Sequence, residues 1–127
     1  TQCDLEALVN SYDNSTIFTD KTLAGLAQIL DGEDGLSSVV LYLSDHGQSL
    51  GENGNYMHGA SPEEAPIEQL EIPFLIWMSD AFKKSRDTSG VATGPVPAQD
   101  ATFHSILGVL NVVGGPYLSK RDIFHVE

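Results

Sequence analysis

One stretch of this 127-residue chain indicates its fold class most clearly: Ser38-Val39-Val40-Leu41-Tyr42-Leu43-Ser44-Asp45-His46-Gly47. Residues 38–43 form a continuous apolar, β-branched run bounded by polar residues. Such a run is typical of a strand buried on both faces, as in a parallel sheet covered by helices. A carboxylate and an imidazole, Asp45 and His46, follow the carboxyl end of this strand directly. Because ligands of open α/β sheets gather beyond the carboxyl ends of strands, this position is a candidate site.

The pattern outside this strand predicts three helices and one more strand. They are a helix over 4–30, a buried strand over 73–78, a short helix over 79–86 and a last helix over 101–110. Asp4 or Thr1 is expected to cap the first helix, Ser79 the second and Asp100 the third. Helix and strand alternate, which predicts an α/β layered fold. Two strands alone make a marginal sheet, so the chain is expected to be part of a larger sheet.

The apolar residues of the two longer helices are expected to form packing faces. In the first helix the face holds Leu5, Leu8, Val9, Tyr12, Thr16, Leu23, Leu26, Ala27 and Leu30, and in the last helix Phe103, Ile106, Leu107 and Leu110. His104 is expected to be a satisfied core histidine and His125 a surface residue. The segments 48–71 and 87–99, rich in Gly, Asn, Pro and Glu, are expected to be loops.

Composition narrows the classes of partner. The chain has 18 acidic and 6 basic residues, a formal net charge of −12, which argues against nucleic acid because phosphate backbones require clustered Lys and Arg. No run approaches the roughly 18 apolar residues of a membrane span, and no signal peptide is visible. The protein is therefore expected to be cytosolic or a piece of something longer. Cys3 is either a buried thiol or half of a disulfide.

Asp45, His46 and His58 are the candidate metal ligands. Carboxylate oxygen and imidazole nitrogen both suit zinc. Neighbouring residues of a strand point to opposite faces, so the strand must end in a turn for Asp45 and His46 to reach one ion, and Gly47 permits such a turn. The alternative is a turn-capping Asp beside a surface His.

A longer stretch gives these residues a family context. Residues Asp45 to Gly59, read as DHGQSLGENGNYMHG, resemble the D-H-G-E-S-L-G-E-N-G-x-Y-L-H-G pattern of the phosphoethanolamine transferases, relatives of the alkaline phosphatases and sulfatases. The similarity continues through 65–77, like A-P-x-E-Q-x-x-x-P-x-x-x-W, and covers 9–14 and 103–108, nearly the whole chain. The resemblance implies a partial three-layer α/β/α sandwich of the alkaline phosphatase type with an incomplete sheet. Residues 1–127 would be a C-terminal fragment of the catalytic domain.

The resemblance also implies site roles, residue by residue. Asp45 and His46 would hold a catalytic zinc ion, and His58 would contact the transferred phosphoryl group or a second zinc. Gln48 stands where the family usually has Glu, which leaves the donor head group open. The family's threonine nucleophile matches no residue of this chain, so the chain alone is expected to be inactive. Family members often carry a cysteine upstream that would pair with Cys3 in an oxidising periplasm.

The implied parent enzyme transfers phosphoethanolamine from a phospholipid to a lipid A-type acceptor through a phosphothreonine intermediate, a modification linked to polymyxin resistance. It would act at the periplasmic face of the bacterial inner membrane, whereas this fragment is expected to be soluble. Its partners would include the missing N-terminal half of the domain, or a second copy bound through an exposed sheet edge. The alternatives are a sulfatase or phosphodiesterase of the same superfamily, and a non-catalytic domain with a remnant metal site.

Overall fold

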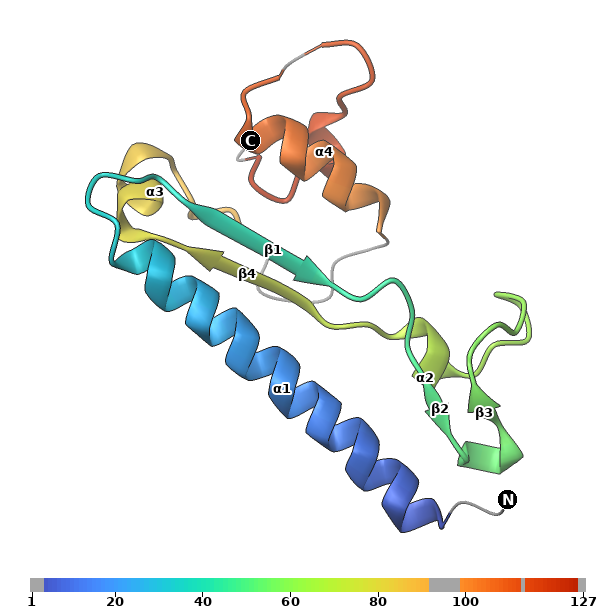
Figure 1. Cartoon of the computed structure of the whole chain (residues 1–127). Coiled ribbons are helices and arrows are strands. Elements are labelled where there is room, and N and C mark those ends of the chain that lie inside the picture. The colour runs from blue at the N-terminus through green and yellow to red at the C-terminus, as the bar shows by residue number, and fades with distance from the viewer. Residues whose placement is uncertain (1–3, 92–98, 113, 126–127) are drawn as a thin grey trace. The chain divides into compact units, whose positions relative to one another are not determined.

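The computed structural model describes residues 4–91, 99–112 and 114–125 and divides the chain into two compact units at Ser79 and Asp80. Cys3 and most of the second predicted loop lie outside the described residues. The first unit contains α1 (Leu5–Asp31), β1 (Val39–Leu43), β2 (Ser49–Leu50), the 3₁₀ turn η1 (Glu52–Gly54), β3 (Tyr56–Met57), α2 (Ile67–Leu70) and β4 (Phe74–Met78). The second unit contains α3 (Asp80–Ser85), α4 (Asp100–Val109) and the 3₁₀ turn η2 (Ser119–Arg121). Figure 1 shows these elements along the chain.

Helix α1 is one unbroken helix of 27 residues, as its apolar spacing predicts (Figure 1). Asp4 caps it by accepting a hydrogen bond from the backbone N–H of Glu6 at 3.2 Å. Gly32 ends it and donates its own N–H to the carbonyl oxygen of Gln28.

The predicted packing face of α1 is only partly covered, and no described residue of the helix is fully buried. Leu5 is 54% exposed and Leu26 41% exposed. Phe18 and Ile29, which lie outside the predicted face, are 72% and 66% exposed. Apolar side chains on several sides of one helix are typical of a helix embedded in a larger core.

Strands β1 and β4 pair in antiparallel order, from Val39 opposite Met78 to Leu43 opposite Phe74. The parallel arrangement expected from the apolar run of β1 is therefore wrong for this pair. An antiparallel neighbour needs no helical crossover, so the chain can return through the segment between the strands. All five residues of β1 are half-buried, because the described part of the sheet has only these two strands.

The segment 48–71, expected to be a loop, contains short regular elements. Strands β2 and β3 form an antiparallel hairpin, with Ser49 opposite Met57 and Leu50 opposite Tyr56. The four-residue helix α2 follows before β4. Elements of two to four residues are too short to produce a periodic pattern, which is why the sequence did not indicate them.

The second unit has a small core around α4. Phe82, Ala101 and Phe124 are buried, and the rings of Phe82 and Phe124 meet edge to face at 6.0 Å. Helix α4 begins at Asp100 itself, so the expected cap lies one residue inside the helix. Its buried residues are Ala101, His104 and Ser105.

The predicted packing face of α4 is largely open. Phe103, Ile106 and Leu110 are 50%, 45% and 65% exposed, so the burial expected for them is wrong within the described structure. Among the described helices, none combines the length and apolar character that crossing a bilayer requires.

Candidate active site

The end of β1 turns sharply, as the metal-site hypothesis requires. The Ser44 hydroxyl donates to the carbonyl oxygen of His46 at 2.7 Å, and the His46 N–H donates to Asp45 Oδ1 at 3.1 Å. The Gly47 N–H then donates to the carbonyl oxygen of Gln69 at 2.9 Å. Asp45 thus caps the turn and still presents its carboxylate, which is 88% exposed.

Gly47 is required here for a different reason from the one expected. Its φ is not among the left-handed values of the described backbone, so the turn does not use the conformational freedom of glycine. Instead, a Cβ at this position would collide with the backbone carbonyl oxygen of Glu68. The missing side chain lets the loop after β1 lie directly against α2.

Asp45 and His46 present two donor atoms of the kinds that bind zinc. The distance from Asp45 Oδ1 to His46 Nε2 is 3.8 Å. Ligand atoms that each lie about 2.0–2.2 Å from one ion can be up to roughly 4.4 Å apart, so the pair fits a single ion. His46 Nδ1 donates to the carbonyl oxygen of Gly47 at 2.8 Å, which leaves the lone pair on Nε2.

The described residues do not contain a group of three or more His, Cys, Asp or Glu side chains arranged to hold a metal ion. Asp45 and His46 bring together two donor atoms, fewer than a zinc site uses. Structural and catalytic zinc sites use at least three protein ligands, so a complete site needs donors beyond the described residues.

His58 lies against His46. The two rings stack with centroids 3.7 Å apart and planes 25° apart. Nitrogen lone pairs lie in the ring planes, so neither imidazole directs a lone pair at the face of the other. In this arrangement His58 is a neighbour of the Asp45–His46 pair.

Gln48 holds His58 in one tautomer. Its amide oxygen lies 2.9 Å from His58 Nδ1, and because an amide oxygen only accepts, Nδ1 carries the proton. The lone pair of His58 is then on Nε2, as it is in His46. The structure thus brings His46, Gln48 and His58 together.

The β2–β3 hairpin that carries His58 is shaped by Glu52. Its carboxylate accepts the Leu50 N–H at 2.7 Å. Hydrogen bonds from the backbone N–H of Glu52 itself, and then from that of Leu50, lower the pKa of this carboxyl from its ordinary value of 4.5. Asn53 and Met57 adopt left-handed backbone conformations, with φ of 52° and 67°. Met57 directly precedes His58, so an uncommon conformation sets the direction in which the imidazole leaves the hairpin.

Two residues beneath the loop were not singled out from the sequence. Ser49 is 1% exposed and Gln69 is 8% exposed, and the Gln69 amide donates to Ser49 Oγ at 3.0 Å. No periodic pattern indicates such a contact between residues twenty apart. The one indication in the sequence is that Ser49 and Gln69 both lie in stretches that resemble the family pattern. That resemblance assigns neither residue a role.

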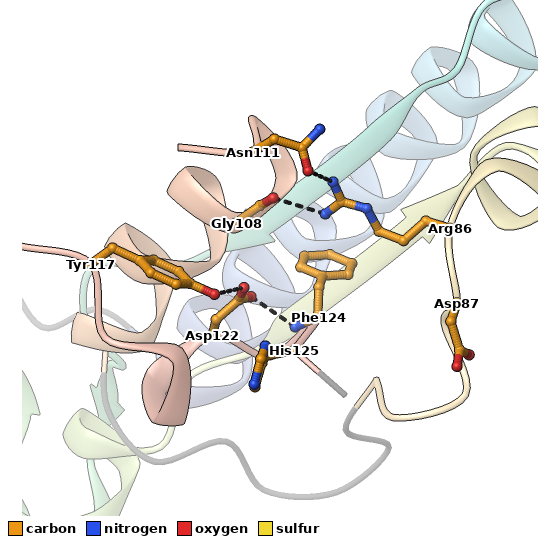
Figure 2. A pocket seen from close by; sticks show the side chains of 8 residues that line it. All are labelled: Arg86, Asp87, Gly108, Asn111, Tyr117, Asp122, Phe124 and His125. Carbon is orange, nitrogen blue, oxygen red and sulfur yellow. Dashed lines mark hydrogen bonds between the residues drawn. The ribbon is translucent and has the colours of Figure 1, made fainter. Parts of the chain in front are cut away.

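The second unit contains a pocket of about 310 Å³, and several of the polar groups that line it bond to one another (Figure 2). The Arg86 guanidinium donates to the carbonyl oxygens of Gly108 and Val109 at 2.9 and 3.1 Å, closing the end of α4. The Tyr117 hydroxyl donates to Asp122 Oδ2 at 2.8 Å, and this bond, with burial, raises the pKa of Tyr117. These contacts support a structural role for the pocket.

The two remaining histidines behave as predicted. His104 is 6% exposed, and its Nδ1 accepts the Leu118 N–H at 3.1 Å. His125 is exposed. Neither residue belongs to the candidate site.

Known proteins are similar to this chain in sequence and in fold. The sulfatase family model matches residues 2–112. Phosphoethanolamine transferase EptA of Helicobacter pylori is 38% identical over 109 residues, which are 86% of this chain and 20% of that protein. The soluble domain of lipooligosaccharide phosphoethanolamine transferase A from Neisseria meningitidis superposes with a TM-score of 0.86 at 34% identity. The C-terminal periplasmic domain of phosphoethanolamine transferase EptC from Campylobacter jejuni gives a TM-score of 0.86 at 38% identity.

These comparisons confirm the predicted fold class and show how much of the relatives' domain this chain covers. Both superpositions cover 97% of this chain but 39% of the solved domain. The chain spans about a fifth of the length of the curated relatives that it matches. Its α/β arrangement is thus that of part of an alkaline phosphatase-like domain. The chain belongs to the sulfatase family, and the relatives that it resembles are phosphoethanolamine transferases.

Proposed function

We propose that residues 1–127 are a C-terminal part of the catalytic domain of a zinc-dependent phosphoethanolamine transferase. The enzyme would move phosphoethanolamine from a phospholipid to a lipid A-type acceptor. Two observations support this: relatives of that activity match nearly the whole chain, and the chain covers only 39% of their solved domains. The remainder of the domain would supply the other half of the active site.

The Asp45–His46 pair carries the proposal. Its Oδ1 and Nε2 atoms are 3.8 Å apart, and the bond from Nδ1 to Gly47 orients the imidazole. These two residues would hold the zinc ion together with ligands from the rest of the domain. Bound there, zinc supplies a Lewis acid that lowers the pKa of a hydroxyl nucleophile and neutralises phosphoryl oxygens.

His58 and Gln48 would act on the substrate side of this pair. The Nε2 lone pair of His58 can accept a hydrogen bond from a protonated phosphoryl oxygen or from the attacking hydroxyl, or can bind a second zinc. Gln48 fixes this tautomer through the 2.9 Å contact with Nδ1. It is neutral where the family pattern has Glu, so it would hold an ethanolamine ammonium less strongly than a carboxylate does.

The nucleophile would be a threonine outside this chain. The threonine hydroxyls of the middle of α1 are already used, because Thr16, Thr19 and Thr22 donate to carbonyl oxygens of their own helix at 3.2, 3.1 and 2.8 Å. The external Thr hydroxyl would lose its proton and its oxygen would bond to phosphorus as the bond to the diacylglycerol oxygen breaks; diacylglycerol takes up a proton and leaves, and the resulting phosphothreonine keeps the ethanolamine group. A hydroxyl or phosphate oxygen of the acceptor would then displace it.

The location follows from the same relatives. The protein would act at the periplasmic face of the inner membrane, since the matching EptC domain is named as periplasmic. The rest of the domain would cover the open edges of the β1–β4 sheet and the exposed apolar residues of α1. Without that cover, the chain is expected to self-associate through these surfaces, which size-exclusion chromatography with light scattering measures.

The transfer reaction tests the proposal directly. The assay follows labelled phosphoethanolamine from phosphatidylethanolamine to lipid A with the protein extended upstream to include the remaining domain. We expect turnover in the extended protein, none in the 127-residue chain, and a loss of at least 100-fold in Asp45→Ala. The matched control is Asp34→Ala, an exposed loop carboxylate. Full activity in extended Asp45→Ala, or turnover by the chain alone, would contradict the proposal.

A further inference from the structure

Gln69 contacts the site loop on both sides of Gln48. It lies in α2 and is 8% exposed. Its carbonyl oxygen accepts the Gly47 N–H at 2.9 Å, and its amide Nε2 donates to Ser49 Oγ at 3.0 Å. A single residue of α2 therefore holds both neighbours of Gln48.

The two contacts lead to the two stacked histidines. Gly47 follows His46 and accepts the hydrogen bond from its Nδ1. Ser49 pairs with Met57 in the hairpin, and His58 comes directly after Met57. The Gly47 contact uses the main chain of Gln69, so the glutamine side chain itself acts through Ser49, in the hairpin that carries His58 against the ring of His46.

Packing alone does not account for a glutamine at this position. Its Oε1 is buried and has no hydrogen-bond partner among the described residues. A buried amide that uses one of its two polar atoms is unfavourable compared with an apolar side chain of the same size. The hydrogen bond to Ser49 is the feature that leucine would lack.

We propose that Gln69 is a positioning residue that sets the stacking of His46 and His58. Its consequence for catalysis rests on the proposed function, in which these rings face a divalent cation and a phosphoryl group. The contact itself needs neither ligand. It can therefore be tested on the metal-free chain.

The test compares His ring-proton chemical shifts by NMR in the 127-residue chain. Stacked rings shift each other's protons upfield, and His58→Ala gives the unstacked reference for His46. We expect Gln69→Leu and Ser49→Ala each to remove at least half of the upfield shift, and the double variant to remove no more than either alone. Gln28→Leu, an exposed glutamine of α1, is the matched control and should retain the shift.

Thermal unfolding identifies a temperature at which every variant is folded. If Gln69→Leu does not fold, Ser49→Ala carries the test, because it removes one oxygen atom. Three results would each overturn the proposal. They are wild-type stacking in folded Gln69→Leu or Ser49→Ala, additive losses of the shift in the double variant, and no stacking in the wild type.

Zinc titration separates this inference from the proposed function. If the wild type binds zinc, both single variants should bind it about tenfold more weakly; unchanged affinity would contradict the positioning role. If the protein extended upstream to include the remaining domain binds no zinc while the ring shifts of the chain still depend on Gln69, the metal proposal fails and the positioning role stands.

Discussion

His104 in the second unit and His46 in the first differ in exposure and in the use of the ring. His104 is 6% exposed, and its Nδ1 accepts a backbone N–H from Leu118. The side chain of His46 is 41% exposed; its Nδ1 donates to Gly47, and its Nε2 faces Asp45. His104 holds two chain segments together, whereas His46 is oriented by its own loop and keeps Nε2 3.8 Å from the Asp45 carboxylate.

The same contrast extends to the neighbouring residues. In the second unit, Ser105 is fully buried and joins Ala101 to Ile123, and Asp122 accepts hydrogen bonds from Tyr117 and Phe124. In the first unit, polar side chains converge at the end of β1 while remaining accessible. Buried polar groups that satisfy one another stabilise a fold; exposed groups held in fixed orientations are suited to binding.

The largest expected effect comes from closing the space beside Gly47. In Gly47→Ala the new Cβ meets the Glu68 carbonyl oxygen, which as backbone cannot move aside. We expect the free energy of unfolding to fall by about 1–3 kcal/mol and zinc binding at Asp45 and His46 to be lost. Urea denaturation and zinc titration measure the two effects. Gly25→Ala, where nothing lies within 4 Å, is the control and should be stabilising by up to about 1 kcal/mol; equal stability of both variants would contradict this account.

The matching change in the second unit separates stability from binding. In Gly108→Ala the Cβ meets the Asp122 carboxylate, which Tyr117 and the Phe124 N–H hold in place. A side chain yields more readily than a backbone, so we expect a loss of about 1–2 kcal/mol, with unchanged zinc affinity. Weaker zinc binding in Gly108→Ala would contradict the expectation that the second unit contributes to stability and not to zinc binding.

Replacing Arg86 should have a smaller effect. Arg86→Lys keeps the charge but cannot reproduce the fork that bonds Gly108, Val109 and Asn111. We expect the free energy of unfolding to fall by about 1 kcal/mol. Lys84→Met, at an exposed position of α3, is the control. An Arg86→Lys protein as stable as the wild type would remove Arg86 from the contacts that close α4.

The smallest effect concerns the pH dependence of the hairpin. The folded pKa of Glu52 lies below its ordinary 4.5, so its stabilisation is complete above that value and is lost as pH falls through the folded pKa. Amide exchange at Leu50 should therefore accelerate below about pH 4.5 in the wild type beyond the intrinsic trend. Glu52→Gln should lack this acceleration, and Glu33→Gln, in an exposed loop, should keep it. The same profile in Glu52→Gln and the wild type would exclude this role.

The sequence predicted the elements that are long enough to show a periodic or continuous apolar pattern. Helix α1, strands β1 and β4, and the buried state of His104 follow from apolar spacing and from polar residues at the ends of the elements. The hairpin and α2 did not, because two to four residues carry no period. The antiparallel pairing of β1 with β4 depends on the path of the intervening chain, which composition does not specify.

The site was predicted in part. The family-like stretch indicated Asp45, His46, Gln48 and His58, and the structure brings the last three into contact. The stacking of the two imidazoles and the contacts of Gln69 depend on tertiary structure. Gly47 shows the difference well: a turn glycine was expected, yet the close approach of α2 is what excludes a side chain.

Zinc titration calorimetry of the 127-residue chain measures whether Asp45 and His46 bind a metal ion. We expect one zinc ion per chain with micromolar or weaker affinity, about −8 kcal/mol, because in the proposed function the described chain would contribute only Asp45 and His46 as ligands. The Asp45→Ala, His46→Ala double variant should give no binding heat, whereas an Asp34→Ala, His125→Ala double variant should match the wild type. Equal heats from the wild type and the Asp45, His46 variant would contradict the account.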